Sequence, residues 1–303
     1  MPCFHPITAY NKIGGGLTWK IHESNGTKTT VSCKQCTGCR QEYSRQWALR
    51  NMHEASLWLN NIFITLTYDN EHLPEHGTLV KKDFQDFMKR LRKKKGANQN
   101  QPIRYYQCVE YGELGRPHYH VCLFNHSFED QYLWKDDEGL YTYSSESLAK
   151  HWPWGFSTVA ELNISTAAYT AGYCFKKITS DRADDHYLRC DEHGVAYWLR
   201  PEYVRMSTGR GKPSGIGASF YEKYSKDIFP SDQSPVPGHG NRELVPRYYQ
   251  NILAETDPHM LEEIKATRQQ FISAHADDFT PERLRDKYKC AQAQQSRKQR
   301  SLP

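Results

Sequence analysis

Hydrophobic positions recur with two different spacings along the first two thirds of the chain, which predicts both helices and strands. Residues 41–60 carry Trp47, Leu49 and Met52 at helical spacing, so they are predicted to form an amphipathic helix. The β-branched and aromatic run NIFITLTY, residues 61–68, is typical of a strand. A second helix is predicted to begin near Asp83 and to end in a basic cluster before a glycine.

The next elements are predicted to complete an antiparallel sheet. Residues 103–110 and 118–124 read as two strands joined by the turn GELGRP, and a polar, aromatic insertion follows them. A short helix is predicted around 145–151, a strand at 155–162, and a helix at 165–178 capped by Ser165 or Thr166. This order predicts an α+β fold, in which helices pack on a central antiparallel sheet.

The periodic signal weakens beyond residue 180. A Gly-rich basic loop occupies residues 207–217, and residues 230–241 read as a linker. We therefore predict three segments: a Cys-bearing segment and helix at 1–60, the sheet domain at 61–229, and a linker with a helical basic tail at 230–303.

Composition sets the class of protein. Hydrophobic residues make up 38% and charged residues 25% of 303, which is enough for a packed core, and the net charge of +5 permits a polyanionic partner. The aromatic share of 13% suits either base stacking or an aromatic core. No stretch approaches the ~20 apolar residues of a membrane span, and the N-terminus lacks signal-peptide features. We expect a cytoplasmic protein without a membrane partner, and no disulfide framework from its nine cysteines.

Two histidines and a glutamate form a predicted metal site. His118 and His120 are alternate residues of one strand, so both imidazoles point to the same face, and Glu110 ends the partner strand. This donor set suits Mg²⁺ or Mn²⁺ with positions open for a phosphate oxygen. The alternatives are a histidine pair without metal, or Glu113 in the turn as the carboxylate. Cys122 continues the same face and is predicted to be core packing.

Two tyrosines are predicted to share a helix face. Tyr169 and Tyr173 are four residues apart, and Lys176 and Lys177 follow within one turn. A tyrosine could attack a phosphodiester if a nearby cation favoured the phenolate. Alone, such a pair more often simply packs on a sheet.

A cysteine cluster and two basic segments are further candidates. Cys33, Cys36 and Cys39, with Cys3 as a fourth ligand, could bind a structural Zn²⁺; free thiols or an iron–sulfur cluster are the alternatives. Basic runs are usually solvated, but some of these side chains could hold DNA phosphates. These are Lys93 and Lys94 in the run 89–95, and Arg205, Arg210 and Lys212 near or in the Gly-rich loop.

The blocks FITLTYD, EYGELGRPHYHVCLF and AAYTAGYCFKK resemble the three motifs of HUH endonucleases. They supply a Thr-containing strand, the His-hydrophobic-His motif and Tyr-x3-Tyr-x2-Lys. The two-tyrosine form is most similar to the rolling-circle replication initiators of gokushovirus-type microviruses. The blocks CKQCTGCRQEYSRQWALRNMHEA and GIGASFYEKY also resemble that group, so the likeness covers about residues 1–225.

The resemblance implies a ferredoxin/RRM-like sheet and a Mg²⁺- or Mn²⁺-dependent tyrosine nickase. Glu110, His118 and His120 would bind the metal, Tyr169 and Tyr173 would be the nucleophiles, and Lys176, with Lys177, would steady the phosphate. Single-stranded origin DNA would be cut through a 5′-phosphotyrosine and rejoined. Gly172 departs from a good helix former just before the second tyrosine.

The sequence also implies which partners the protein needs and which rival functions remain. No GxxxxGK[ST] loop is present, so a host helicase, as well as a host polymerase, would be required in the bacterial cytoplasm. A relaxase or transposase of the same superfamily is one rival, although relaxases usually show a third histidine. A non-catalytic single-strand binder is the other, and it would need exposed aromatics on the central strands.

Overall fold

The chain forms two compact units in a computed structural model, which describes residues 3–97, 101–112, 114–137, 139–172, 182–209 and 213–300. One unit comprises residues 1–44 and 257–303, and the other comprises residues 45–256. The three segments predicted from the sequence stay a prediction. Among the described residues, no helix is both long enough and apolar enough to cross a bilayer.

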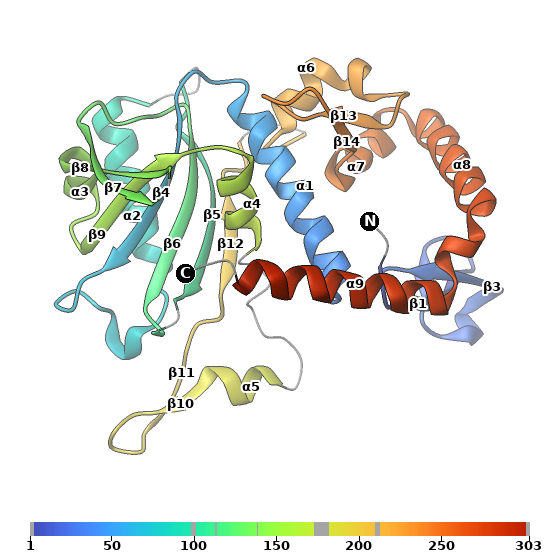
Figure 1. Ribbon diagram of the computed structural model, residues 1–303, viewed down its shortest axis with the longest axis horizontal. Helices are drawn as coiled ribbons and strands as arrows, with labels where there is room; N and C mark the ends of the chain where they lie inside the picture. Colours follow the sequence, from blue (N-terminus) through green and yellow to red (C-terminus); the bar gives the residue numbers. More distant parts are fainter. Residues whose placement is uncertain are drawn as a thin grey trace. The chain divides into compact units, whose positions relative to one another are not determined.

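A seven-stranded antiparallel sheet forms the centre of the larger unit, which confirms the predicted α+β class (Figure 1). Its strands lie in the order β12-β5-β6-β4-β9-β8-β7. Their bounds are β4 Asn61–Tyr68, β5 Arg104–Tyr111, β6 Pro117–Phe124, β7 Gln131–Asp137, β8 Leu140–Ser145, β9 Gly155–Glu161 and β12 Tyr203–Met206. The segment predicted as an insertion thus contains β7 and β8, which extend the sheet at one edge.

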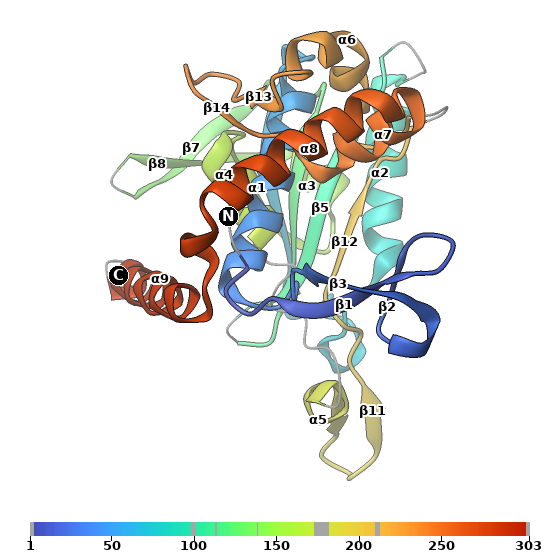
Figure 2. The same cartoon turned by 90° about the vertical axis from the view of Figure 1, so that its right-hand side faces the viewer.

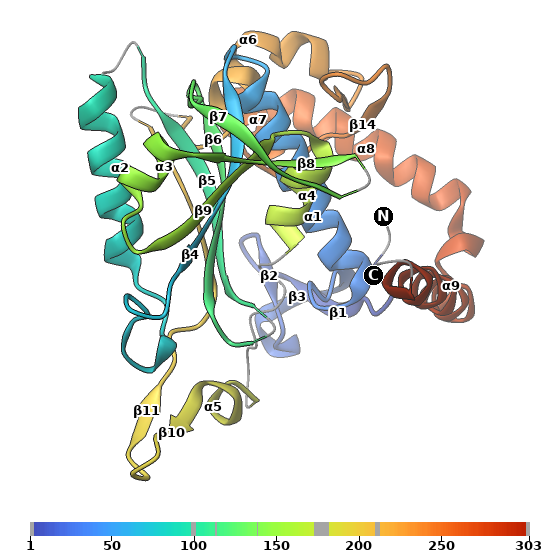
Figure 3. The same cartoon turned by 60° about the vertical axis from the view of Figure 1, so that its left-hand side comes forward.

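Helices cover both faces of this sheet (Figure 3). On one face α2 packs through Phe84, Phe87, Met88 and Leu91 against alternate residues of β4 and β6, in a core that includes Tyr119. On the other face α1 and α4 contribute alanines to a smaller core around Phe63 and Cys122. The helices of this part of the chain are α1 Thr37–Ala55, α2 Lys81–Lys95, α3 Glu146–His151, α4 Ile164–Gly172, α5 Arg182–Tyr187, α6 Ala218–Ile228 and α7 Arg247–Thr256.

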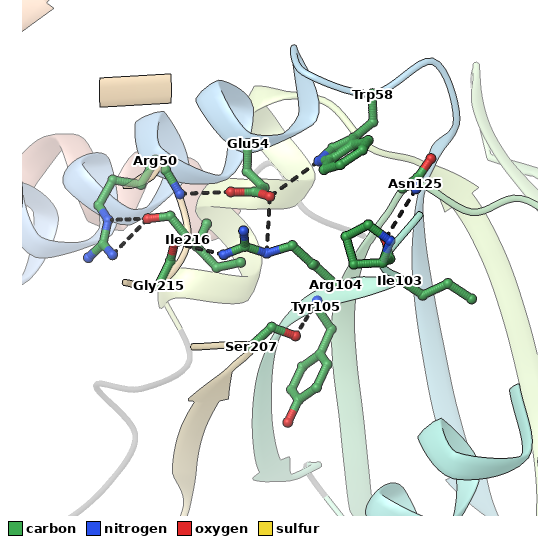
Figure 4. Close-up of polar contacts among 12 residues, drawn as sticks. Arg50, Glu54, Trp58, Ile103, Arg104, Tyr105, Asn125, Ser207, Gly215 and Ile216 are labelled. Carbon is green, nitrogen blue, oxygen red and sulfur yellow. Dashed lines mark hydrogen bonds and ion pairs between the residues drawn. The ribbon is translucent and has the colours of Figure 1, made fainter. Parts of the chain in front are cut away.

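A buried ion pair fixes α1 to the sheet (Figure 4). The fully buried Glu54 of α1 lies 3.2 Å from Nε of Arg104 on β5 and accepts hydrogen bonds from Trp58 and from the Gly217 N–H. Arg104 and Arg50 donate in turn to the carbonyls of Gly215 and Ile216. Since both charges have several partners, the helix, strand and loop are held in one arrangement.

Among the described residues, the smaller unit contains a three-stranded sheet, ordered β2-β1-β3, the start of α1 and two further α-helices (Figure 2). Few residues of these strands are buried. The bounds are β1 Ile7–Lys12, β2 Leu17–Thr18, β3 Ser24–Val31, α8 Pro258–Ala274 and α9 Pro281–Arg300. In the larger unit two short hairpins complete the described strands, namely β10 Leu188–Cys190 with β11 Ala196–Trp198, and β13 Gln233–Pro235 with β14 Arg242–Leu244.

Candidate metal centre and tyrosine helix

The hairpin β5–β6 brings the three predicted metal ligands together. Glu110 is the direct cross-strand partner of His118, and His120 lies two residues further along the same face. One ligand atom from each side chain lies within 4.8 Å of the others. The carboxylate Oε1 of Glu110 is 3.1 Å from Nε2 of His120, and both of these side chains are buried. Two imidazoles and one carboxylate at this spacing could hold a divalent metal ion.

Two residues outside the predicted triad contact the imidazole of His120. Oγ1 of Thr65, the cross-strand partner of His120 on β4, lies 3.2 Å from Nδ1 of that ring. A tautomer in which Nδ1 donates to Thr65 leaves Nε2 as the ligand atom. The ring of Phe63 lies parallel to that of His120 with centroids 6.0 Å apart. The sequence places Thr65 in a predicted strand but indicates no role for it, which becomes visible only from its pairing with His120.

A glycine provides the space for His118. A Cβ atom on Gly112 would stand 2.7 Å from Cε1 of the His118 ring, closer than real contacts allow. Gly112 directly follows β5 and bonds to the carbonyl of Arg116 across the turn. The hairpin end therefore accommodates the ring only with glycine at this position. The predicted alternative ligand, Glu113, lies outside the described residues.

Helix α4 carries Tyr169 over this same face. The side chain of Asn163 caps the helix by accepting hydrogen bonds from the N–H groups of Ser165 and Thr166, so the predicted capping residues were wrong. The Tyr169 ring is half exposed and lies edge-on to His120, with centroids 5.4 Å apart. Burial and the nearby charge of Glu110 raise the pKa of Tyr169, so its phenol is protonated at neutral pH.

The other predicted site residues fall into two groups. Tyr173, Lys176, Lys177, Arg210 and Lys212 lie outside the described residues. Lys93 and Lys94 are exposed on α2, which covers the sheet face opposite to the histidines, so the fold does not bring them to the metal site. Cys122 is fully buried, which confirms its prediction as core.

Four cysteines converge in the smaller unit. Sγ of Cys3 is 3.4 Å from that of Cys33 and 3.9 Å from that of Cys36, and Cys33 is 4.0 Å from Cys39. All four sulfur atoms lie within 4.8 Å of one another. Backbone N–H groups of Phe4, Cys33 and Cys36 donate to three of the sulfurs. Burial opposes ionisation of Cys36, but N–H groups of Cys39 and Phe4 lower its pKa to about 6. This cluster could also bind a metal ion.

Comparisons with known proteins give the family. The family model for "Replication-associated protein ORF2/G2P" matches residues 61–178. Replication-associated protein VP4 of Bdellovibrio phage phiMH2K is 31% identical over 268 residues, which cover 85% of this chain and 79% of the phage protein. Replication-associated protein ORF2 of Spiroplasma virus 4 is 30% identical over 294 residues, which cover 89% of this chain and 86% of the virus protein. Replication-associated protein ORF4 of Chlamydia phage 1 is 26% identical over 238 residues, which cover 77% of this chain and 55% of the phage protein.

No solved structure matches the chain. The relatives are nevertheless aligned over most of both sequences, and the matched family segment contains the hairpin, the histidines and α4. The chain therefore belongs to the replication-associated protein ORF2/G2P family of microviruses.

Proposed function

We propose that this replication-associated protein nicks and rejoins single-stranded origin DNA through a tyrosine nucleophile. The observation that carries the proposal is the convergence of Glu110, His118 and His120 beneath the Tyr169 ring. When bound by these three side chains, Mg²⁺ or Mn²⁺ supplies Lewis-acid polarisation of a phosphate. The donor set fits such an ion because its members lie on one rigid hairpin, and Thr65 orients one imidazole.

The chain's own groups then account for the transfer. The phenol oxygen of Tyr169 attacks phosphorus, and its proton passes to water. The bond from phosphorus to the 3′ oxygen breaks, and that oxygen takes up a proton to become a 3′-hydroxyl. The product is a 5′-phosphotyrosine, which a 3′-hydroxyl later attacks to restore the phosphodiester and the phenol. The exchange is redox-neutral, and positioning supplies much of the rate.

The test is a covalent adduct between the full-length protein and a labelled single-stranded oligonucleotide that carries the phage origin, formed with Mn²⁺ and resistant to denaturation. Tyr169→Phe should impair cleavage or joining, and Tyr169→Phe with Tyr173→Phe should form no adduct. Tyr132→Phe is a matched control, since Tyr132 is 52% exposed and Tyr169 is 50% exposed. His118→Ala should abolish nicking while DNA binding persists. An adduct that survives the double substitution would overturn the nucleophile assignment. Binding of the oligonucleotide by the wild-type protein without any adduct would favour a non-catalytic binder.

We further propose that Zn²⁺ occupies the four-cysteine cluster as a structural ion. Four thiolates suit tetrahedral zinc, and the three backbone N–H groups that donate to the sulfurs would offset their negative charge. Metal analysis of purified protein should find one zinc per chain, and Cys36→Ala should lose it. In the bacterial cytoplasm the protein would work with a host helicase and a host polymerase.

A further inference from the structure

An aromatic ring stands exposed on the face of the sheet that carries the histidines. The side chain of Phe156, at the start of β9, is 69% exposed. Phe156 is the cross-strand partner of Thr67 on β4, and Thr67 is in turn the partner of His118 on β6. Directly paired residues point to the same face of a sheet. Phe156 therefore lies in one row with His118, two strands away from it.

The backbone fixes the position of this ring. Gly155, which precedes it, has φ of +146°, and a Cβ atom there would stand 2.2 Å from the backbone nitrogen of Asp69. The Asp69 N–H donates to the carbonyl of Trp154 at 3.0 Å. Only glycine allows β9 to approach the end of β4 this closely. The exposed ring is thus carried by a strand that is paired with β4, and not by a loop.

The ring borders a depression of about 540 Å³ that is also lined by a positive charge. Arg116, two residues before His118, lines the same depression, and its guanidinium donates to the carbonyl of Tyr68 and to Oδ1 of Asn70. Among the described residues it forms no ion pair with a carboxylate. Two carboxylates, those of Asp69 and Glu71, also line the depression, and that of Asp69 accepts hydrogen bonds from His72. The guanidinium is therefore held in place by neutral oxygens and keeps its charge available for an anion.

We propose that this depression is a nucleotide subsite for single-stranded DNA beside the metal centre. Phe156 stacks on one unpaired base, and Arg116 pairs with the adjoining phosphate. This assignment rests on the proposed nicking function, because it places the nucleotide next to the phosphate that Tyr169 attacks. The occupant is single-stranded because bases in a duplex are already stacked on each other and cannot offer a face to the ring.

The test measures binding of a fluorescently labelled single-stranded oligonucleotide to the full-length protein by anisotropy, with no divalent ion added. Phe156→Ala should weaken binding roughly 5- to 150-fold, the usual effect of losing one stacked base, and Phe156→Trp should restore it. Trp134→Ala is the matched control, because Trp134 is 67% exposed but does not line the depression. Binding of duplex DNA should not change.

The salt dependence tests the phosphate contact separately. The slope of log affinity against log salt is negative. Arg116→Gln should make it shallower by about 0.7, the value for one phosphate of a single strand. Arg116→Lys should keep most of that slope. Equal effects of Phe156→Ala and Trp134→Ala, or an equal loss for duplex DNA, would overturn the subsite. Since these measurements need no cleavage, failure of the nucleophile test leaves them valid. If Phe156→Ala binds single-stranded DNA as tightly as the wild-type protein and the wild-type protein nicks normally, the subsite is refuted and the proposed nicking function stands.

Discussion

At the scale of single residues, a missing side chain decides where the His118 ring can stand. Gly112 has an ordinary φ, so glycine is needed there for space and not for backbone conformation. The atoms that a new methyl group would meet belong to the imidazole itself. Because a ring can move more easily than a strand, we expect alanine at this position to displace the proposed metal ligand and leave the hairpin folded.

Gly112→Ala should therefore weaken Mn²⁺ binding about 10- to 100-fold, as loss of a ligand-supporting group does, with little change in melting temperature. Titration calorimetry of protein that carries zinc only at the four cysteines measures the Mn²⁺ affinity, and calorimetric unfolding measures the melting temperature. Gly240→Ala is the matched control, since a Cβ there meets no atom within 4 Å. Equal Mn²⁺ affinity in both variants would show that His118 does not depend on the space at residue 112.

A second residue-scale effect concerns His53, which is fully buried and stacks on Phe220. Nδ1 lies 2.8 Å from the Tyr249 hydroxyl, and Nε2 lies 2.8 Å from the Pro235 carbonyl, so the neutral ring is satisfied. Burial lowers the pKa of His53 to about 4. The unfolded chain binds a proton near pH 6.5, whereas the folded protein resists it. The stability that the neutral His53 ring contributes is therefore fully present above pH 6.5 and is lost as pH falls towards 4.

The free energy of unfolding should fall by about 3 kcal/mol from this group across that pH window. Urea unfolding at several pH values measures the loss. His53→Gln, although less stable at pH 7, should show a shallower pH dependence, and the exposed His239→Gln should retain the original one. A slope that His53→Gln leaves unchanged would place the proton uptake elsewhere.

At the scale of elements, local patterns predicted the centre of the sheet but not its edges. β4, β5 and β6 each have at least one apolar face, and the register of the β5–β6 hairpin follows from its short turn, so the pairing of Glu110 with His118 was predictable. β7 and β8 form an edge hairpin with mostly exposed side chains, so no alternation marks them. β12 pairs with a strand about a hundred positions earlier, which no local period reveals. Thr65 and Gly112 were missed for the same reason, since they act across strands.

The element-scale prediction concerns the ion pair between α1 and β5. Arg104→Met leaves the charge of Glu54 buried without its cation and should cost about 3–5 kcal/mol. Adding Glu54→Gln removes that charge but keeps an acceptor for the Gly217 N–H, so the double variant should recover part of the loss. Chemical unfolding measures both variants. Lys150→Met breaks an exposed pair and should change stability by less than about 1 kcal/mol. A double variant less stable than Arg104→Met would contradict the argument.

At the scale of the whole molecule, the two units differ in what holds them together. The larger unit has an extensive core on both faces of its sheet. In the smaller unit the strands β1–β3 bury little besides Ala9 and Thr18. Phe4, beside the cysteine cluster, is buried and contacts Tyr288 of α9, with ring centroids 5.6 Å apart. A metal at the cysteines would therefore stabilise both the small sheet and the contact of Phe4 with α9.

Removing zinc should consequently loosen one unit and not the other. In hydrogen exchange of the full-length protein, a zinc-selective chelator should speed exchange in β1–β3 and around Tyr288 by roughly tenfold or more, because the fold there has little core to replace the metal. Exchange in β4–β6 should stay slow. Cys36→Ala should reproduce this pattern without chelator, and the exposed Cys190→Ala should not. Because Phe4 directly follows Cys3, uniform protection after zinc loss would mean that the four sulfurs meet without stabilising the strands that carry them.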